Sequence, residues 1–224
     1  MELKTDGIVL KRYRQGETDD ITVIFTRDMG KVLVSSKSTR KLSSKLKPAL
    51  ELFSLNRYVL VKGRKDSRYF TLTQAENVKM FESTRLSLRK IGFSYLVMEL
   101  LNKFTEIEDP NSELFDLALD IMNIVESGDY SNVENIESFF KLRILKYSGY
   151  DLTGDAEYLR EKRVAKEAKA LLATILDAPD AKKLDVEYDI IRDLNMLIDS
   201  YIIYILGEDI FSARFLQGLK DGGR

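Results

Sequence analysis

The first third of this 224-residue sequence contains two groups of lysine and arginine that could bind phosphates. No acidic residue occurs between positions 31 and 47, and the cations there are Lys31, Lys37, Arg40, Lys41, Lys45 and Lys47. The second group has Asp66 as its one acid and consists of Arg57, Lys62, Arg64, Lys65 and Arg68. Arg14, earlier in the chain, adds a further positive charge. One such group alone would be typical of an ordinary solvated surface, but two in one predicted domain favour nucleic-acid binding, because cations displace counterions from phosphates whatever the base sequence.

Aromatic residues alternate with these cations along the predicted strands. Tyr13, Tyr58 and Tyr69 could stack on unpaired bases, which would favour single strands over duplex. The competing interpretation, which is the favoured one for aromatic residues on strands, places them in the core of the β domain. Phe25, Phe53 and Phe70 are assigned to that core.

Catalytic chemistry has few candidates in this sequence. Cysteine and histidine are both absent, which excludes disulfides, thiol nucleophiles, Cys/His zinc sites and Ser-His-Asp triads. Glu17, Asp19 and Asp20 could be imagined as part of a metal-dependent nuclease, but they are more simply interpreted as solvated turn residues. No glycine-rich phosphate loop occurs. We therefore predict a protein that is not an enzyme and needs no cofactor or metal.

One arginine in the second part of the chain stands out. Arg143 lies between Leu142 and Ile144 in an apolar segment. A guanidinium there either pairs with a carboxylate in the core or faces an incoming anion, such as the end of a partner peptide. The pairing is favoured, and the partner site is the alternative.

The charges are separated along the chain, although the formal net charge is only −1. Residues 1–79 hold 17 lysines and arginines against nine acids, a net charge of +8, and residues 80–224 have a net charge of −9. Such asymmetry is typical of a module that faces nucleic acid next to one used differently. We therefore predict two domains, 1–79 and 80–224.

The elements that must position these residues change type at the same boundary. Period-2 patterns and short turns predict five strands, at Leu3–Arg14, Asp20–Arg27, Gly30–Lys37, Leu50–Lys62 and Arg68–Ala75. The longest connection follows the third strand, which favours an OB-type Greek-key β-barrel, with an SH3-like barrel as the alternative. In an OB barrel, the second and third strands form the usual groove for oligonucleotides.

After residue 83 the apolar pattern has a period of 3.6 and predicts an all-α domain. Helices are expected over 93–104, 114–125, 136–147, 164–175, 190–205 and 209–219. Asn111 or Ser112 is the expected cap of the second helix, and Ser131 with Glu134 fits a capping box for the third. The fold class is therefore α+β with two domains.

No segment of the sequence predicts a signal peptide or a membrane span. The chain opens without an apolar stretch, and its longest apolar run, Met196–Leu206, is short and contains Asp199. We expect a soluble cytoplasmic protein that is associated with the nucleoid when it is bound to DNA.

Several short patterns, taken in order, resemble the RecO family of bacterial DNA repair and recombination mediators. In the first domain they are Gly7–Leu10, Gly16-Glu17 with Asp19, Thr26, Gly30-Lys31, Arg40 with Ser44, Leu50–Phe53 and Leu72–Glu76. In the second they are Phe140, Leu142-Arg143, Leu145, Gly149-Tyr150 and Ser212–Leu216. The resemblance covers most of the chain.

The resemblance implies a protein that binds single- and double-stranded DNA and anneals complementary strands. It also implies a role in the RecF pathway, in loading recombinase onto gaps coated by single-strand-binding protein. The implied partners are RecR and the acidic C-terminal tail of single-strand-binding protein, for which the helix of Arg143 is a candidate surface. The rival hypothesis is a protein-interaction adaptor with a small β-barrel and no affinity for DNA.

One feature of the family is missing. Many relatives have a four-cysteine zinc module after the segment that matches Gly149-Tyr150, whereas residues 151–178 contain no cysteine. Zinc cannot be held there, so any rigidity must come from packing of the helix expected at 164–175.

Overall fold

Five strands form a closed barrel in the computed structural model, which describes residues 2–15, 19–36, 46–63, 67–128 and 133–221. The strands are β1 (Glu2–Gln15), β2 (Asp19–Thr26), β3 (Gly30–Ser36), β4 (Ser54–Lys62) and β5 (Tyr69–Met80). They follow the order β1-β2-β3-β5-β4 around the barrel, and β3 pairs with β5 in parallel while every other pair is antiparallel. This is the Greek-key order of an OB-type barrel, so the fold prediction is confirmed.

Two strand boundaries differ from the sequence prediction. The fourth strand was expected from Leu50, but Pro48–Leu50 form a 3₁₀ turn and β4 begins at Ser54. Phe53, with φ of 61°, interrupts the extended chain just before the strand. The fifth strand continues beyond Ala75 to Met80, because β4 pairs with it as far as Ser54 opposite Met80.

Seven α-helices follow the barrel within the described residues: α1 (Leu88–Phe104), α2 (Ser112–Ser127), α3 (Val133–Tyr147), α4 (Ala156–Glu161), α5 (Lys166–Asp177), α6 (Tyr188–Leu206) and α7 (Phe211–Asp221). All six predicted helices are present, and only the short α4 was not expected. Asn111 caps α2, since its side chain accepts a hydrogen bond from the Leu114 N–H at 2.9 Å. Ser131 lies outside the described residues, and the Glu134 carboxylate pairs with Arg89. None of the described helices is both long and apolar enough to cross a membrane.

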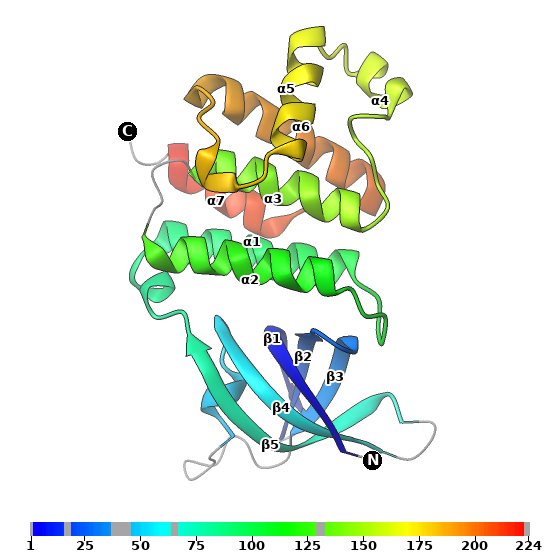
Figure 1. Cartoon of the computed structure of the whole chain (residues 1–224), viewed down its shortest axis with the longest axis vertical. Coiled ribbons are helices and arrows are strands. Elements are labelled where there is room, and N and C mark those ends of the chain that lie inside the picture. The colour runs from blue at the N-terminus through cyan, green and yellow to red at the C-terminus, as the bar shows by residue number, and fades with distance from the viewer. Residues whose placement is uncertain (1, 16–18, 37–45, 64–66, 129–132, 222–224) are drawn as a thin grey trace.

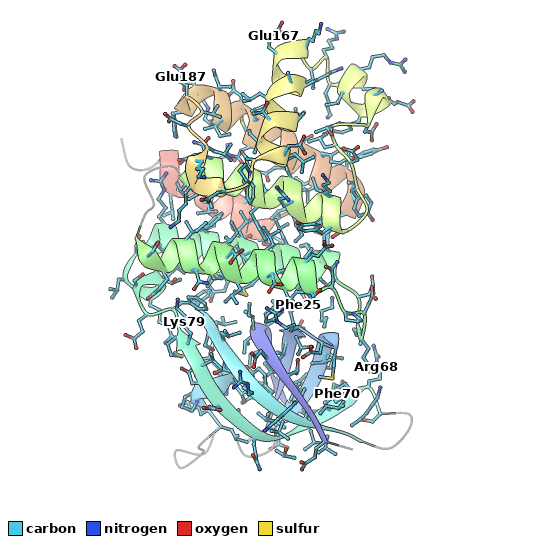
Figure 2. The ribbon with its side chains drawn as sticks, in the orientation of Figure 1. Phe25, Arg68, Phe70, Lys79, Glu167 and Glu187 are labelled. Atoms are coloured by element: carbon cyan, nitrogen blue, oxygen red, sulfur yellow. The ribbon has the colours of Figure 1, made fainter. Side chains whose placement is uncertain are left out.

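The barrel interior and the helical layers have separate apolar clusters. Ile24, Tyr58 and Phe70 belong to the cluster inside the barrel. The larger cluster starts on the outer face of β1 and β2, at residues such as Phe25, and continues without interruption into the helices. The Phe25 ring lies 5.9 Å from that of Phe115 on α2, and Figure 2 shows Phe25 near the α2 end of the barrel and Phe70 further down. Phe25, Phe53 and Phe70 are all buried, as predicted.

The β2–β3 hairpin makes several contacts that hold the barrel against the helices. Figure 1 shows α1 and α2 as a layer across the end of the barrel, with the other helices beyond them. Arg27 pairs with Asp116 on α2, and Lys31 forms a parallel bridge with Ile107 in the α1–α2 connection. At the hairpin, Gly30 has a φ of 67° and lies so close to Asp109 that a Cβ atom would be 2.0 Å from its carbonyl oxygen.

Gly30→Ala is therefore expected to destabilise the protein more than Gly128→Ala does. Both glycines have positive φ, but no described residue lies within 4 Å of a Cβ placed at Gly128. The left-handed conformation costs alanine about 1–2 kcal/mol at either position, and the clash at Gly30 adds about 1–3 kcal/mol. Urea unfolding of the two variants measures this difference, and equal unfolding free energies would contradict the close approach at Gly30.

Candidate nucleic-acid interface

Tyr13 and Tyr69 lie on the same outer face of the barrel, with β2 and β3 between them. In the strand register Tyr13 pairs with Ile21, Ile21 pairs with Ser35, and Leu33 pairs with Tyr69. Side chains at paired positions share one face of a sheet, so these five residues form a continuous surface, which we call the tyrosine face. Tyr13 is 43% exposed and Tyr69 is 37% exposed. Both can therefore be reached from solvent.

The dimensions of the tyrosine face suit unpaired bases. Neighbouring strands lie about 4.8 Å apart, so the path around the curved barrel wall from β1 through β2 and β3 to β5 crosses roughly 15 Å. The half-buried Ile21 and Leu33 lie along this path, and Leu33 also packs against the apolar cluster that continues into the helices. Aromatic rings that flank an apolar strip can stack on any base, because every base has a π face. The surface is also the β2–β3 face that OB barrels commonly use.

Several cations border the tyrosine face. The Lys11 ammonium lies 4.8 Å from the centre of the Tyr13 ring. Arg14 is exposed near the end of the same strand, but it pairs with Asp20 in the register and therefore lies on the opposite side of β1 from Tyr13. Arg68 immediately precedes Tyr69 and is exposed, and Figure 2 shows it at the edge of the barrel. Neither Arg14 nor Arg68 forms an ion pair with another described residue. Lys47 is also exposed, at the start of the 3₁₀ turn before β4.

Three other predicted cations are held by partners. The Lys31 ammonium donates to the Asn102 carbonyl of α1 at 2.7 Å, so Lys31 lies at the contact with the helices and not among the cations at the rim of the tyrosine face. Burial lowers the pKa of Lys31 below its ordinary value, and the negative charge of Glu106 opposes this only in part. Arg57 pairs with Asp6 at 2.9 Å, and Lys62 pairs with Glu108.

Tyr58 does not belong to this interface. It is completely buried inside the barrel, where its hydroxyl donates to the Ala49 carbonyl at 2.7 Å and accepts from Asn56 at 3.1 Å. Burial raises the pKa of its phenol well above the ordinary value. The prediction that Tyr58 stacks on bases is therefore wrong, because Tyr58 faces the interior together with Leu60.

The remaining predicted contacts cannot be placed. Lys37, Arg40, Lys41, Lys45, Arg64 and Lys65 lie outside the described residues and remain predictions from the sequence.

The acidic turn differs from the expectation. Asp20 is buried and pairs with Arg12 at 2.7 Å, so it is not a solvated turn residue. Among the described residues no three acidic side chains come together as a metal site would require.

Within the described part of the chain Arg143 does not pair with a core carboxylate, contrary to the expectation. Its guanidinium donates to the Ala178 carbonyl at 2.8 Å and to the Tyr147 hydroxyl at 3.3 Å. It borders a cleft between α2 and α3 whose charged lining also includes Lys79, Glu113, Asp116, Asp120, Asp180 and Lys182. Burial raises the pKa of Asp120, and the nearby charges of Asp116 and Asp180 add to the shift. The four carboxylates of the cleft outnumber its three cations, so it does not offer a purely basic surface to an acidic peptide.

The buried cation of the helical domain is Lys141, which the sequence analysis did not identify. Lys141 is fully buried and pairs with Glu137 on its own helix at 2.6 Å and with Asp199 on α6 at 2.5 Å. Burial alone would lower the pKa of Lys141, but the two carboxylates outweigh it and raise the pKa above the ordinary value. A glutamate four residues before a lysine in an apolar helix was the one local signal available.

Comparison with known proteins gives two family matches and a group of similar sequences. The model described as Recombination protein O N terminal matches residues 1–81, and Recombination protein O C terminal matches residues 85–170. The chain is 32% identical over 149 residues to DNA repair protein RecO of Alkaliphilus metalliredigens, which covers 66% of this chain and 59% of that protein.

Two further relatives show the same extent of similarity. DNA repair protein RecO of Pelotomaculum thermopropionicum is 32% identical over 147 residues, covering 66% of this chain and 55% of the relative. DNA repair protein RecO of Caldanaerobacter subterraneus is 31% identical over 150 residues, covering 66% and 58%. The match thus spans somewhat more than half the length of these relatives.

Proposed function

The chain belongs to the RecO family, and on this premise we propose that it is a non-enzymatic mediator of DNA repair and recombination. In this proposal it binds single- and double-stranded DNA, anneals complementary strands, and helps to load recombinase onto gaps coated by single-strand-binding protein. RecR and the acidic tail of single-strand-binding protein are the proposed protein partners. The cleft beside Arg143 mixes carboxylates with cations, which favours a site for that tail elsewhere on the helical domain.

The tyrosine face is the observation that carries the proposal. Tyr13 and Tyr69 would stack on bases, while Lys11 and Arg68 would bind neighbouring phosphates and the exposed Arg14 would add positive charge at the end of β1. Neutralising phosphates on two strands lowers their mutual repulsion and brings the strands together for pairing. Annealing by this route needs neither nucleotide hydrolysis nor a metal ion.

The logarithm of the affinity for oligo(dT) is expected to fall linearly with the logarithm of the salt concentration, with a slope of about −0.7 per phosphate neutralised. Arg68→Ala removes one proposed phosphate contact and is expected to make this slope shallower by about 0.7. Fluorescence anisotropy with a labelled oligonucleotide over a salt series measures both effects.

The control is Arg192→Ala, because Arg192 is also an exposed arginine but pairs with Asp189 and Asp193 on α6. It should leave the slope unchanged. No measurable affinity at low salt would contradict the proposal and favour the adaptor without DNA affinity.

A further inference from the structure

A short acidic segment of the helical domain lies against the barrel next to its basic residues. This segment, which we call the acidic loop, is Glu106–Asp109 in the α1–α2 connection and carries three carboxylates. Figure 1 shows the connection descending from the helical layer to the β3 side of the barrel. A negatively charged segment therefore lies next to the barrel, which we propose binds DNA through its positive charges.

Backbone contacts hold the acidic loop in place. The Glu108 N–H donates to the Lys31 carbonyl at 2.9 Å, and Ile107 forms a parallel bridge with Lys31. The close approach of Gly30 to Asp109 fixes the end of the acidic loop. Near its start, the Lys31 ammonium donates a hydrogen bond to the Asn102 carbonyl in the last turn of α1. The loop is therefore built onto the start of β3, and its carboxylates stay close to the barrel.

Glu108 points at one of the predicted DNA-binding cations. Its carboxylate pairs with the Lys62 ammonium, at the end of β4. Phe70 is the register partner of Lys62 on β5, so Arg68 and Tyr69 lie at the same end of the β4–β5 pair. Glu108 thus places a negative charge beside the rim of the tyrosine face.

The ion pair between Glu108 and Lys62 is of the kind that a phosphate can displace. The two side chains are 39% and 40% exposed, so water screens the pair and it contributes little to stability. A DNA phosphate presents to Lys62 the same anionic oxygen chemistry as the carboxylate does. While Glu108 occupies Lys62, however, that lysine cannot neutralise a phosphate, and the loop also repels nearby phosphates.

We propose that Glu108 competes with DNA phosphates for Lys62, so that the acidic loop limits how tightly the barrel holds a strand. The inference rests on the proposed DNA-binding function and adds a regulatory element to the same surface. A mediator that anneals strands must release them after pairing, and a built-in competitor for one phosphate site lowers the affinity without removing the site.

Glu108→Gln in the full chain tests the proposal. The variant keeps the backbone contacts of the loop but removes the charge, so affinity for oligo(dT) at low salt is expected to rise about three- to fivefold. The salt slope should become steeper by about 0.7, because one more phosphate is neutralised. In a Lys62→Met background, the same substitution should give no gain beyond that of the control.

The control is Glu113→Gln, which removes the same charge from an exposed residue in the first turn of α2 that is not part of any ion pair among the described residues. Equal affinities and slopes for Glu108→Gln and Glu113→Gln would overturn the proposal. Urea unfolding should show that both variants are folded. If Arg68→Ala and the replacement of Tyr13 or Tyr69 by alanine lower DNA affinity but Glu108→Gln does not raise it, only this inference fails. If they leave DNA affinity unchanged, the proposed function fails as well.

Discussion

Lys141→Ala is expected to lower the free energy of unfolding by about 3–5 kcal/mol, because it leaves two carboxylates in the helical core without their cation. Glu137 is almost completely buried, and Asp199 is mostly covered by the packing of α6 on α3. In a domain of this size the loss corresponds to a fall in Tm of roughly 6–20 °C. Thermal unfolding followed by circular dichroism measures it.

Lys146→Ala is the matched control for Lys141→Ala. Lys146 lies on the same helix and also pairs with an aspartate, Asp177, but both side chains are mostly exposed and 3.9 Å apart. Surface pairs of this kind are worth about 0–1 kcal/mol, so the control should change Tm little. If the two variants were equally stable, Lys141 would not hold α3 and α6 together.

Alanine at Tyr13 or Tyr69 is expected to weaken binding of single-stranded DNA by about 1–3 kcal/mol for each tyrosine. This corresponds to about a fivefold to more than a hundredfold loss of affinity. The physical reason is the loss of a stacking platform for one base at each position. Titration of labelled oligo(dT) at fixed salt measures the change, and the double variant should lose the most.

Two controls separate stacking from other effects at the tyrosine face. Phenylalanine at both positions keeps the rings and should keep most of the affinity, since stacking does not need the hydroxyl. Tyr188→Ala removes an equally exposed tyrosine at the start of α6 and should have no effect. An alanine double variant that binds like the unchanged protein would show that DNA does not contact this face.

The barrel was predictable from the sequence because strand alternation and connection lengths are local properties. The side of the sheet on which each residue lies was harder to predict, since β1 has a bulge between Val9 and Lys11 that moves later residues to the other face. Tyr58 could nevertheless have been assigned to the core from the sequence. It lies on the opposite side of β4 from the exposed Arg57 and shares the inner face with Leu60.

The roles of Lys31 and Lys141 could not be predicted in this way, because their partners lie in distant parts of the chain. Lys31 looks like the other basic residues until α1 is placed against the hairpin. Lys141 needs Asp199, which α6 supplies only after the helices have packed. Long-range packing therefore decided which cations remain accessible.

Residues 151–178 are held in place by the packing of apolar and aromatic side chains. Within residues 151–178, α5 buries Leu172 and Ile175 against the helical core, in agreement with the expectation that this helix must supply rigidity. The unexpected α4 is capped by Asp155 and packs Tyr158 against Tyr201 on α6, with ring centres 4.8 Å apart. Aromatic contacts thus join apolar packing in fixing this part of the chain.

The apolar cluster shared by the barrel and the helices has a practical consequence for dissecting the protein. A fragment cut after β5 would leave Ile8, Leu10, Val23 and Phe25 uncovered on one side of the barrel. An exposed apolar patch of that kind promotes self-association. Oligonucleotide capture by such a truncated piece would therefore report on aggregates, and experiments on strand binding should keep the α1 and α2 layer attached.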